Sequence, residues 1–461
     1  MKSKLHLTIL IIAALLLGGC ASPTQAPPEP TAVPTEAPAE PEPTEAPAPT
    51  EAPAEPVETE PAAEEPAEVV ELRFTYYADG VEADVIKPLL DKFMAANPDI
   101  KVVLDVVPYQ TIDEQLPVQV ETGEGPDLAR ITNFGAFKGK LLDLREYLTD
   151  PDSYVAAFQA PILEALGYGG FPDAMTVTGP FVNKTLFDQA GIEVPGEGTT
   201  WEEWTELTKE VAEATGVQYA IAIDRTGHRF AGPALSMGAQ LINEDNTFTV
   251  DTPGFRAFAE IVKSWHDEGI TPADVWLGAE PVGSCINAFK SGQLVFCYSG
   301  SWQINGVAND VGDAFDWVVV PNPTGEGGST GIAGGSAVVA FADTEYPEQV
   351  ARLMEFLIAP ENYAEFSAGT LSLPAHATVA KQGVDFKTDN EFVLGALDAF
   401  TAEIPKLSEQ GVALNVHPYS FAYYRNSANR ISQYLTGELT LDEMLVSLQE
   451  DIDLAIAEAQ Q

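Results

Sequence analysis

The stretch that decides the fold is Phe289-Lys-Ser-Gly-Gln-Leu-Val-Phe-Cys-Tyr-Ser-Gly-Ser-Trp302. It begins with the last turn of a predicted helix, and Gly292 suits the left-handed backbone position that ends a helix. The apolar run from Leu294 to Tyr298 has the length and composition of a buried strand. A turn of small residues then delivers Trp302, whose flat aromatic face can line a cleft or pack in the core. The local pattern leaves both roles of Trp302 open.

Two of the three cysteines belong to this region: Cys285 just before the stretch and Cys297 within it. Cys285 lies near the start of the helix that ends at Gly292, and Cys297 lies near the end of the strand that follows. A helix that folds back on its strand brings these two positions together, so we predict a disulfide between them. A bond that closes so short a loop stabilises a protein by about 3 kcal/mol. Two cysteines without further thiols or suitably spaced histidines make a poor zinc site, and we expect no metal.

The N-terminus has the features of an exported lipoprotein. Met1-Lys-Ser-Lys4 is basic, and the largely apolar run that follows ends in Leu17-Gly-Gly-Cys20. Such a pattern is typical of a secretory signal peptide, and the run is shorter than the roughly 20 residues of a membrane-spanning helix. The ending resembles the bacterial lipobox, which predicts a signal peptide at 1–20 and lipidation of Cys20. We therefore expect a protein anchored at the outer face of the cell membrane, periplasmic or extracellular; an ordinary cleaved signal peptide is the alternative.

Residues 21–68 are mostly Pro, Ala, Thr and Glu. Such a composition cannot bury enough apolar surface to offset the entropy of ordering, so we expect a disordered tether. At about 3.1 Å per residue, a fully extended polyproline-like segment of this length reaches on the order of 150 Å.

The chain carries a formal net charge of −47, from 70 acidic and 23 basic residues. A nucleic-acid-binding protein needs a basic surface, so nucleic acid is excluded as a partner. The acidity favours a neutral or cationic ligand over a phosphorylated one. A high-salt habitat is a further explanation that the sequence leaves open.

Predicted strands and helices alternate after residue 69. Strands are expected at 72–77, 100–107 and 127–132, with helices at 85–96 and 112–121 between them and a short one at 141–148. This alternation predicts an α/β fold in which helices flank a mostly parallel sheet. Ligands lie beyond the carboxyl ends of such strands, which points to residues 77–80, 108–110 and 132–134.

Later segments continue the pattern and form a second lobe. The part of the chain after residue 69 has about 390 residues, more than a single hydrophobic core usually includes. Thr200 and Glu203 form a predicted capping box for a helix that runs to about residue 214. The expected later strands and helices are at 219–223, 255–266, 317–320, 336–341, 349–357 and 427–457, the last broken near Gly437.

The sequence carries none of the common catalytic motifs. The glycine run at 325–331 lacks the Gly-Lys-Ser/Thr ending of a phosphate-binding loop, and no Gly-x-Ser-x-Gly elbow stands at a strand-to-helix turn. We therefore predict a protein that is not an enzyme and needs no cofactor. A secreted glycoside hydrolase is a distant alternative, because the many acids could include a catalytic carboxylate pair.

Five segments, taken in order, resemble a known family. They are Phe93-Met-Ala-Ala-Asn-Pro-Asp-Ile-Lys-Val102, Gly123-Glu-Gly-Pro-Asp-Leu128, Gly139-Lys-Leu-Leu-Asp-Leu144, Val182-Asn-Lys-Thr-Leu-Phe-Asp-Gln-Ala-Gly191 with Thr200-Trp-Glu-Glu203, and Phe289 to Trp302. The ordered set resembles the extracellular solute-binding proteins of ABC importers, in the sugar-binding family 1 group that includes maltose-binding protein. The resemblance covers nearly all of Leu72 to Ala457.

The resemblance implies a type II periplasmic-binding-protein-like fold with two α/β lobes joined by hinge crossings. The N-terminal lobe would contain 69–179 and 328–371, and the C-terminal lobe 180–327 and 372–461. It also implies a monomeric subunit that captures a sugar or oligosaccharide between closing lobes and delivers it to a membrane permease. A binding protein for a cationic solute, such as a polyamine, is the alternative that the acidity favours.

Aromatic residues at predicted strand exits suit a sugar, because rings pack on its apolar faces while polar neighbours bind its hydroxyls. The resemblance favours Trp302 as the stacking platform. The candidate ligand-binding residues are Trp302, Tyr77, Asp79, Tyr109, Asn133, Phe134, Trp276, Ser301, Gly335, Tyr423 and Arg425.

Overall fold

The computed structural model describes residues 69–78, 80–278 and 283–460. Four predictions concern residues outside these ranges and stay predictions: the signal peptide at 1–20, lipidation of Cys20, the tether at 21–68 and the role of Asp79.

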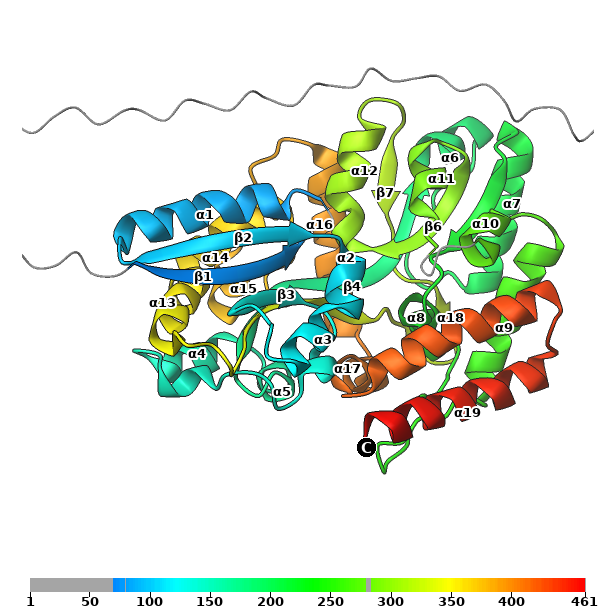
Figure 1. The fold of residues 1–461 in the computed structure, drawn as a ribbon. Coiled ribbons are helices and arrows are strands. Elements are labelled where there is room, and N and C mark those ends of the chain that lie inside the picture. Colours follow the sequence, from blue (N-terminus) through cyan, green and yellow to red (C-terminus); the bar gives the residue numbers. More distant parts are fainter. Residues whose placement is uncertain (1–68, 79, 279–282, 461) are drawn as a thin grey trace, which may run out of the picture. The chain divides into compact units, whose positions relative to one another are not determined.

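Strands and helices alternate in the first part of the chain, as the sequence predicts (Figure 1). In chain order they are β1 (Val70–Tyr77), α1 (Glu82–Ala96), β2 (Ile100–Val107), α2 (Tyr109–Glu114), α3 (Leu116–Glu121), β3 (Leu128–Ile131), α4 (Pro151–Ala157), α5 (Ala160–Ala165) and the long strand β4 (Gly170–Asn183).

Two of the predicted helices differ from the structure. The helix expected at 112–121 is divided into α2 and α3. Pro117 explains the division, because it lacks an N–H and its ring clashes with the carbonyl four residues earlier in a continuous helix. The helix expected at 141–148 is only a 3₁₀ turn, Leu144–Glu146, since Leu141 is extended and pairs with Phe341 in a β-bridge.

The middle part of the chain again alternates helices and strands. Its elements are α6 (Lys184–Ala190), α7 (Trp201–Thr215), β5 (Tyr219–Ile223), α8 (Gly227–Ser236), α9 (Pro253–Asp267), α10 (Ala273–Leu277), α11 (Ile286–Lys290), β6 (Leu294–Gly300), α12 (Ile304–Val311) and β7 (Trp317–Val319). The predicted capping box of α7 is present: Thr200 Oγ1 accepts from Glu203 N at 3.1 Å, and Thr200 N donates to the Glu203 carboxylate at 2.9 Å.

The last part returns to the first sheet and ends in helices. The elements are β8 (Thr324–Gly325), β9 (Gly328–Ser329), β10 (Ala333–Ala340), α13 (Pro347–Ile358), α14 (Pro360–Thr370), α15 (Ala377–Gln382), α16 (Glu391–Glu403), α17 (Glu409–Val416), α18 (Ser420–Thr436) and α19 (Leu441–Ala459).

One mixed sheet connects the two halves of the fold, in the strand order β2-β1-β3-β10-β4-β6-β5, with β7 also paired to β4. The pairs β1–β2, β1–β3 and β5–β6 are parallel. The long strand β4 is antiparallel to β10 along its first part and to β6 and β7 along its second part. Strand β4 therefore carries the chain from one half of the sheet into the other.

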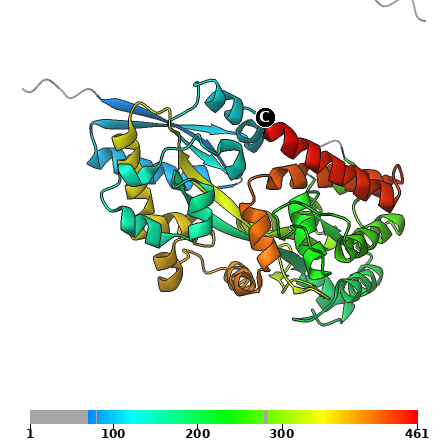
Figure 2. The same ribbon diagram turned by 90° about the horizontal axis from the view of Figure 1, so that it is seen from below.

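The hydrophobic core is divided in the same way. Adjacent residues of β1 point to opposite faces, so Tyr76 belongs to one buried cluster and Tyr77 to another. A third cluster surrounds β5, β6 and the second part of β4 and extends to Ile452 of α19. Figures 1 and 2 show the blue, cyan and yellow elements in one group and the green elements with the orange and red helices in the other. The lobe boundaries proposed from the sequence stay predictions.

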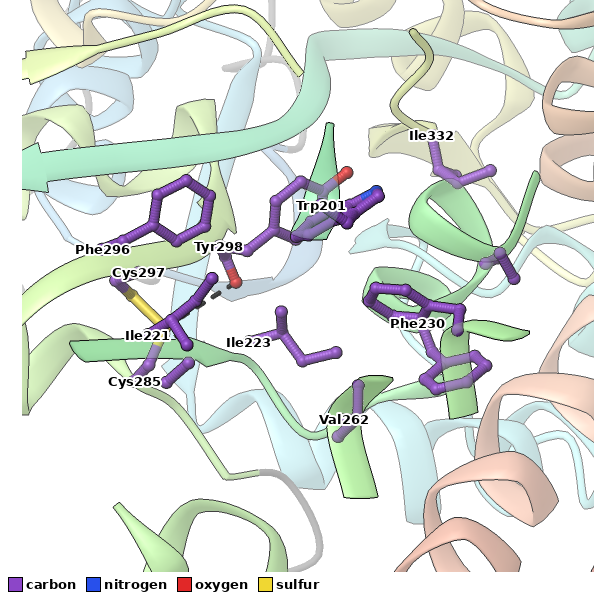
Figure 3. Packing of buried hydrophobic residues seen from close by; sticks show 14 of the residues in the cluster. Trp201, Ile221, Ile223, Phe230, Val262, Cys285, Phe296, Cys297, Tyr298 and Ile332 are labelled. Carbon is purple, nitrogen blue, oxygen red and sulfur yellow. Dashed lines mark hydrogen bonds between the residues drawn. A yellow bond between two sulfur atoms is a disulfide. The ribbon is translucent and has the colours of Figure 1, made fainter. Parts of the chain in front are cut away.

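The decisive stretch folds as predicted around a disulfide. Helix α11 ends before Gly292, which has a φ of 72°, and every residue of β6 is buried. Cys285 and Cys297 are bonded, with their Cα atoms 5.7 Å apart, and both side chains are fully buried. Figure 3 shows the bond beside Ile221 of β5, below Phe296 and Tyr298 of β6. The disulfide therefore fixes the start of α11 to the strand that precedes Trp302.

Replacing both cysteines with alanine should lower the free energy of unfolding by about 3 kcal/mol, because the short loop is no longer closed in the unfolded chain. Urea unfolding of the wild type and of the double variant Cys285→Ala/Cys297→Ala measures the difference. Wild-type protein treated with reductant after unfolding is the matched control and should behave like the double variant. Equal stability of all three forms, or two free thiols in the untreated wild type, would contradict the prediction.

Candidate functional site

A cavity of about 1130 Å³ lies between the two halves of the sheet. Its walls come from both: Tyr77 and Tyr109 on one side, and Arg229, Trp302 and Tyr424 on the other. Pockets for drug-sized ligands usually measure about 300–1,000 Å³. This cavity is therefore large enough for a ligand of more than one ring.

Seven of the predicted site residues line the cavity. They are Tyr77, Tyr109, Phe134, Ser301, Trp302, Gly335 and Arg425. They come from distant parts of the sequence, and the carboxyl ends of strands β1 and β6 bring several of them together. Their contact with a ligand stays a prediction.

Three other predicted residues, Asn133, Trp276 and Tyr423, are not part of the cavity lining, and their contact with a ligand stays a prediction. Asn133 caps the 3₁₀ turn Phe134–Phe137, where its side chain accepts from Ala136 N at 3.2 Å. Trp276 is buried, and its Nε1 donates to the carbonyl oxygen of Ile223 at 3.1 Å. Tyr423 is also buried, with its ring stacked on Phe248 at 6.0 Å between centroids.

Tyr424, the residue after Tyr423, lines the cavity. Successive residues of a helix point about 100° apart, so Tyr423 faces the core and Tyr424 faces the cavity. The buried residues of α18 recur at helical spacing, as Ser420, Tyr423 and Ser427 do. This spacing can be recognised in the sequence and distinguishes the buried Tyr423 from Tyr424.

The first wall of the cavity is aromatic and is held by a buried arginine. The rings of Tyr77 and Tyr109 meet edge to face at 5.2 Å, and the Tyr109 hydroxyl lies 2.9 Å from Thr132 Oγ1. Arg130 donates to the Tyr77 carbonyl at 3.0 Å and to the Asp173 carboxylate at 2.8 Å. Its guanidinium lies 4.4 Å from the centre of the Tyr77 ring. This cation–π contact orients a ring that is itself only 2% exposed.

Trp302 and Arg229 form the opposite wall. The Arg229 guanidinium lies over the indole, 4.3 Å from the ring centre, so it covers one face of Trp302. Gly300 permits this position of the ring, because a Cβ at residue 300 would lie 1.9 Å from it. A ligand can therefore stack only on the part of the indole that Arg229 leaves uncovered.

The buried side chain of Asp224 connects the segments that form this wall. Its carboxylate accepts from Ser299 Oγ at 2.5 Å, from Cys285 N at 2.8 Å and from Ser284 Oγ at 2.9 Å. Burial raises the pKa of the Asp224 carboxyl above its ordinary value, and the charge of Arg229 is the largest opposing influence. Cys285 and Cys297 also approach Asp224, but their sulfurs are bonded to each other and offer a metal no thiolate.

Asp224, Arg229 and their neighbour His228 were missed by the sequence analysis. They belong to the segment Asp224-Arg-Thr-Gly-His-Arg229, which directly follows strand β5. The signal for this segment is its place at the carboxyl end of β5, where ligands of α/β sheets lie, as they do beyond the earlier strands.

Contacts between the two halves close one edge of the cavity. Arg425 of α18 donates to the Asp113 carboxylate of α2 at 2.5 Å. Nearby, the backbones of Gly135 and Pro418 touch, since a Cβ on Gly135 would lie 1.9 Å from the Pro418 carbonyl oxygen. A ligand in the cavity is thus enclosed by groups from both halves.

Two α/β halves that enclose a large cavity define a two-lobed binding protein. Residues 89–393 match the model of the family described as bacterial extracellular solute-binding protein. The chain belongs to this family. Among helices in the described part of the chain, none combines the length and the apolar character that crossing a membrane requires.

Similar proteins agree with this assignment. The chain is 26% identical over 326 residues to a binding protein of Brucella abortus (68% of this chain, 76% of the relative). It is 27% identical over 192 residues to the arabinooligosaccharide-binding protein of Halalkalibacterium halodurans (40% and 42%). The structure of an ABC substrate-binding protein from Listeria monocytogenes in complex with cycloalternan superimposes with a TM-score of 0.71 at 20% identity, covering 85% of this chain and 100% of that one. The fold is thus the two-lobed type II fold of periplasmic binding proteins.

His228 makes stability depend on pH. Burial, together with the charge of Arg229, lowers the pKa of His228 to about 3, against about 6.5 in an unfolded chain. Below pH 6.5 His228 therefore binds a proton in the unfolded chain but stays neutral in the folded chain. The contribution of His228 is complete above pH 6.5 and is lost as the pH falls. Between pH 7 and 5 the wild type should lose about 2 kcal/mol more than His228→Gln.

Urea unfolding of both proteins at pH 7 and pH 5 measures this difference. Burial also lowers the pKa of His266, to about 4, but that residue is present in both proteins and cancels in the comparison. The same loss of stability in the wild type and the variant would show that His228 is not held neutral.

Proposed function

We propose that this protein is the substrate-binding subunit of an ABC importer and that its solute is a sugar or oligosaccharide. The observation that carries the proposal is the placement of aromatic rings on opposite sides of one cavity: Tyr109, supported by the buried Tyr77, on one side, and Trp302 with Tyr424 on the other. Aromatic rings pack on the apolar C–H faces of sugars, and the polar residues between them can bind hydroxyls. The names of the Halalkalibacterium relative and the Listeria structure support a saccharide.

Closure follows from the placement of these walls. A ligand touches both walls only when the two halves are together, so its binding energy favours the closed form. The contact between Arg425 and Asp113 and that between Gly135 and Pro418 belong to that form. The closed protein then docks on a membrane permease and releases its solute there. We further propose that lipidated Cys20 keeps the protein at the membrane, and that the protein itself performs no reaction.

A saccharide panel tests this function. Arabino-, malto- and xylo-oligosaccharides of increasing length should include at least one that stabilises the protein against urea. At a ligand concentration 100 times Kd, the free energy of unfolding should rise by about 2.7 kcal/mol. If the protein bound a polyamine and no saccharide, its solute would be cationic and the assignment of a sugar would be wrong. Hydrolysis of the bound saccharide by the pure protein would contradict a role limited to binding.

Gly300→Ala should weaken binding of whichever saccharide the panel identifies, by about tenfold or more. The new Cβ would overlap the Trp302 ring and force it away from its place in the cavity wall. Gly196→Ala is the matched control, because a Cβ at Gly196 meets no atom within 4 Å and residue 196 does not line the cavity. Calorimetric titration of the three proteins measures the effect. Equal affinity in all three would show that Trp302 does not contact the ligand.

A further inference from the structure

The cavity differs in charge from the rest of the protein. The whole chain has a formal net charge of −47. Five basic residues nevertheless line the cavity: Arg130, Lys138, Arg225, Arg229 and Arg425. The acidic residues in the described lining are also five: Glu82, Asp113, Glu114, Glu164 and Asp224. The described wall is therefore balanced in charge, and basic groups are strongly concentrated there.

Most of the arginines in this wall are engaged by other protein groups. Arg130 is paired with Asp173, and Arg425 is paired with Asp113. Arg225 donates to Ser432 Oγ at 3.0 Å and to Asn429 Oδ1 at 3.3 Å. Three of the four guanidinium groups in the wall thus have protein partners, and these contacts connect the parts of the wall.

Arg229 is different. The nearest carboxylate oxygen in the described structure belongs to Asp224 and lies 3.9 Å from Arg229 Nε, beyond hydrogen-bond distance. Both Asp224 oxygens already accept from Ser284, Cys285 and Ser299. Within residues 69–78, 80–278 and 283–460, the only side-chain hydrogen bond that Arg229 donates goes to Thr226 Oγ1, at 3.5 Å. Its Nε is buried and has no partner among the described groups.

An arginine with so few hydrogen-bond partners in the protein is suited to bind an anion. The buried Nε is out of a ligand's reach, but the Arg229 side chain as a whole is 22% exposed and lines the cavity. The planar guanidinium, held over Trp302, presents its donors in a fork that matches the two oxygens of a carboxylate. The lining acids favour a singly charged carboxylate over a phosphate, which carries nearly two charges at neutral pH and would be repelled more strongly.

We propose that the solute is a saccharide that carries a carboxylate, such as a uronate oligosaccharide, and that Arg229 binds this carboxylate. The inference rests on the proposed function, because it names the chemical class of the solute in the same cavity. Arg229 thereby sets specificity between acidic sugars and their neutral counterparts.

Calorimetric titration with matched ligand pairs tests the proposal. Each pair consists of a uronate oligosaccharide (galacturonate, guluronate, mannuronate or glucuronate units) and its methyl ester, which keeps the carbon skeleton and removes the charge. We expect at least one acid to bind tenfold or more tightly than its ester. Arg229→Gln should remove this preference, and Arg229→Lys should keep the charge but retain only part of it, since it lacks the fork.

Arg352→Gln is the matched control for the loss of one positive charge. Arg352 lies on α13, is paired with Asp99 and does not line the cavity, so its replacement should leave the preference unchanged. Circular dichroism and urea unfolding establish that each variant is folded.

The other outcomes are distinguishable. Binding of neutral saccharides or esters as tight as that of the acids would overturn the inference and leave the proposed function standing. An acid preference that survives in Arg229→Gln would overturn the role of Arg229. Failure of every saccharide, acidic or neutral, would overturn the proposed function together with the inference.

Discussion

The buried carboxylate of Asp224 is the interaction on which the second wall of the site depends. An ionised carboxylate is tolerated in a protein interior only when hydrogen bonds and nearby positive charge replace its hydration. Asp224 has both, because three donors from the segment before α11 and the end of β6 converge on it, and Arg229 lies just beyond. The same group thus links the exit of β5, the disulfide at Cys285 and the turn that presents Trp302. Removing it would free three separate segments at once.

The two walls are built on different principles. The first is a pair of rings packed against Arg130 of β3, and Arg130 is itself fixed by Asp173 of β4, on the far side of β10. The second is a single indole, fixed by its own strand and covered on one face by Arg229. Strand β4 pairs with β10 in one half of the sheet and with β6 in the other, so one continuous strand connects the two walls.

Sequence alone predicted the features that depend on local chemistry. The glycine stop at Gly292, the buried strand after it and the disulfide all follow from residue types at fixed spacing. The aromatic residues at the ends of β1 and β6 follow from a general rule about α/β sheets. The division of the predicted helix at Pro117 was equally local and was overlooked. The phase of α18, which turns Tyr424 and not Tyr423 to the cavity, was also local and was overlooked. The role of Asp224, in contrast, required donors that lie 60, 61 and 75 residues away in sequence. Such convergence is a property of the folded chain and leaves no pattern in any one segment.

The contact between Gly300 and the Trp302 ring also limits which sequences can share this site. No amino acid with a Cβ fits at residue 300 while the indole stays where it is. A relative with any other residue at that place must therefore carry its aromatic platform elsewhere or do without one. Glycine at this place is thus a requirement for an indole in the position of Trp302, although glycine alone does not bring an indole with it.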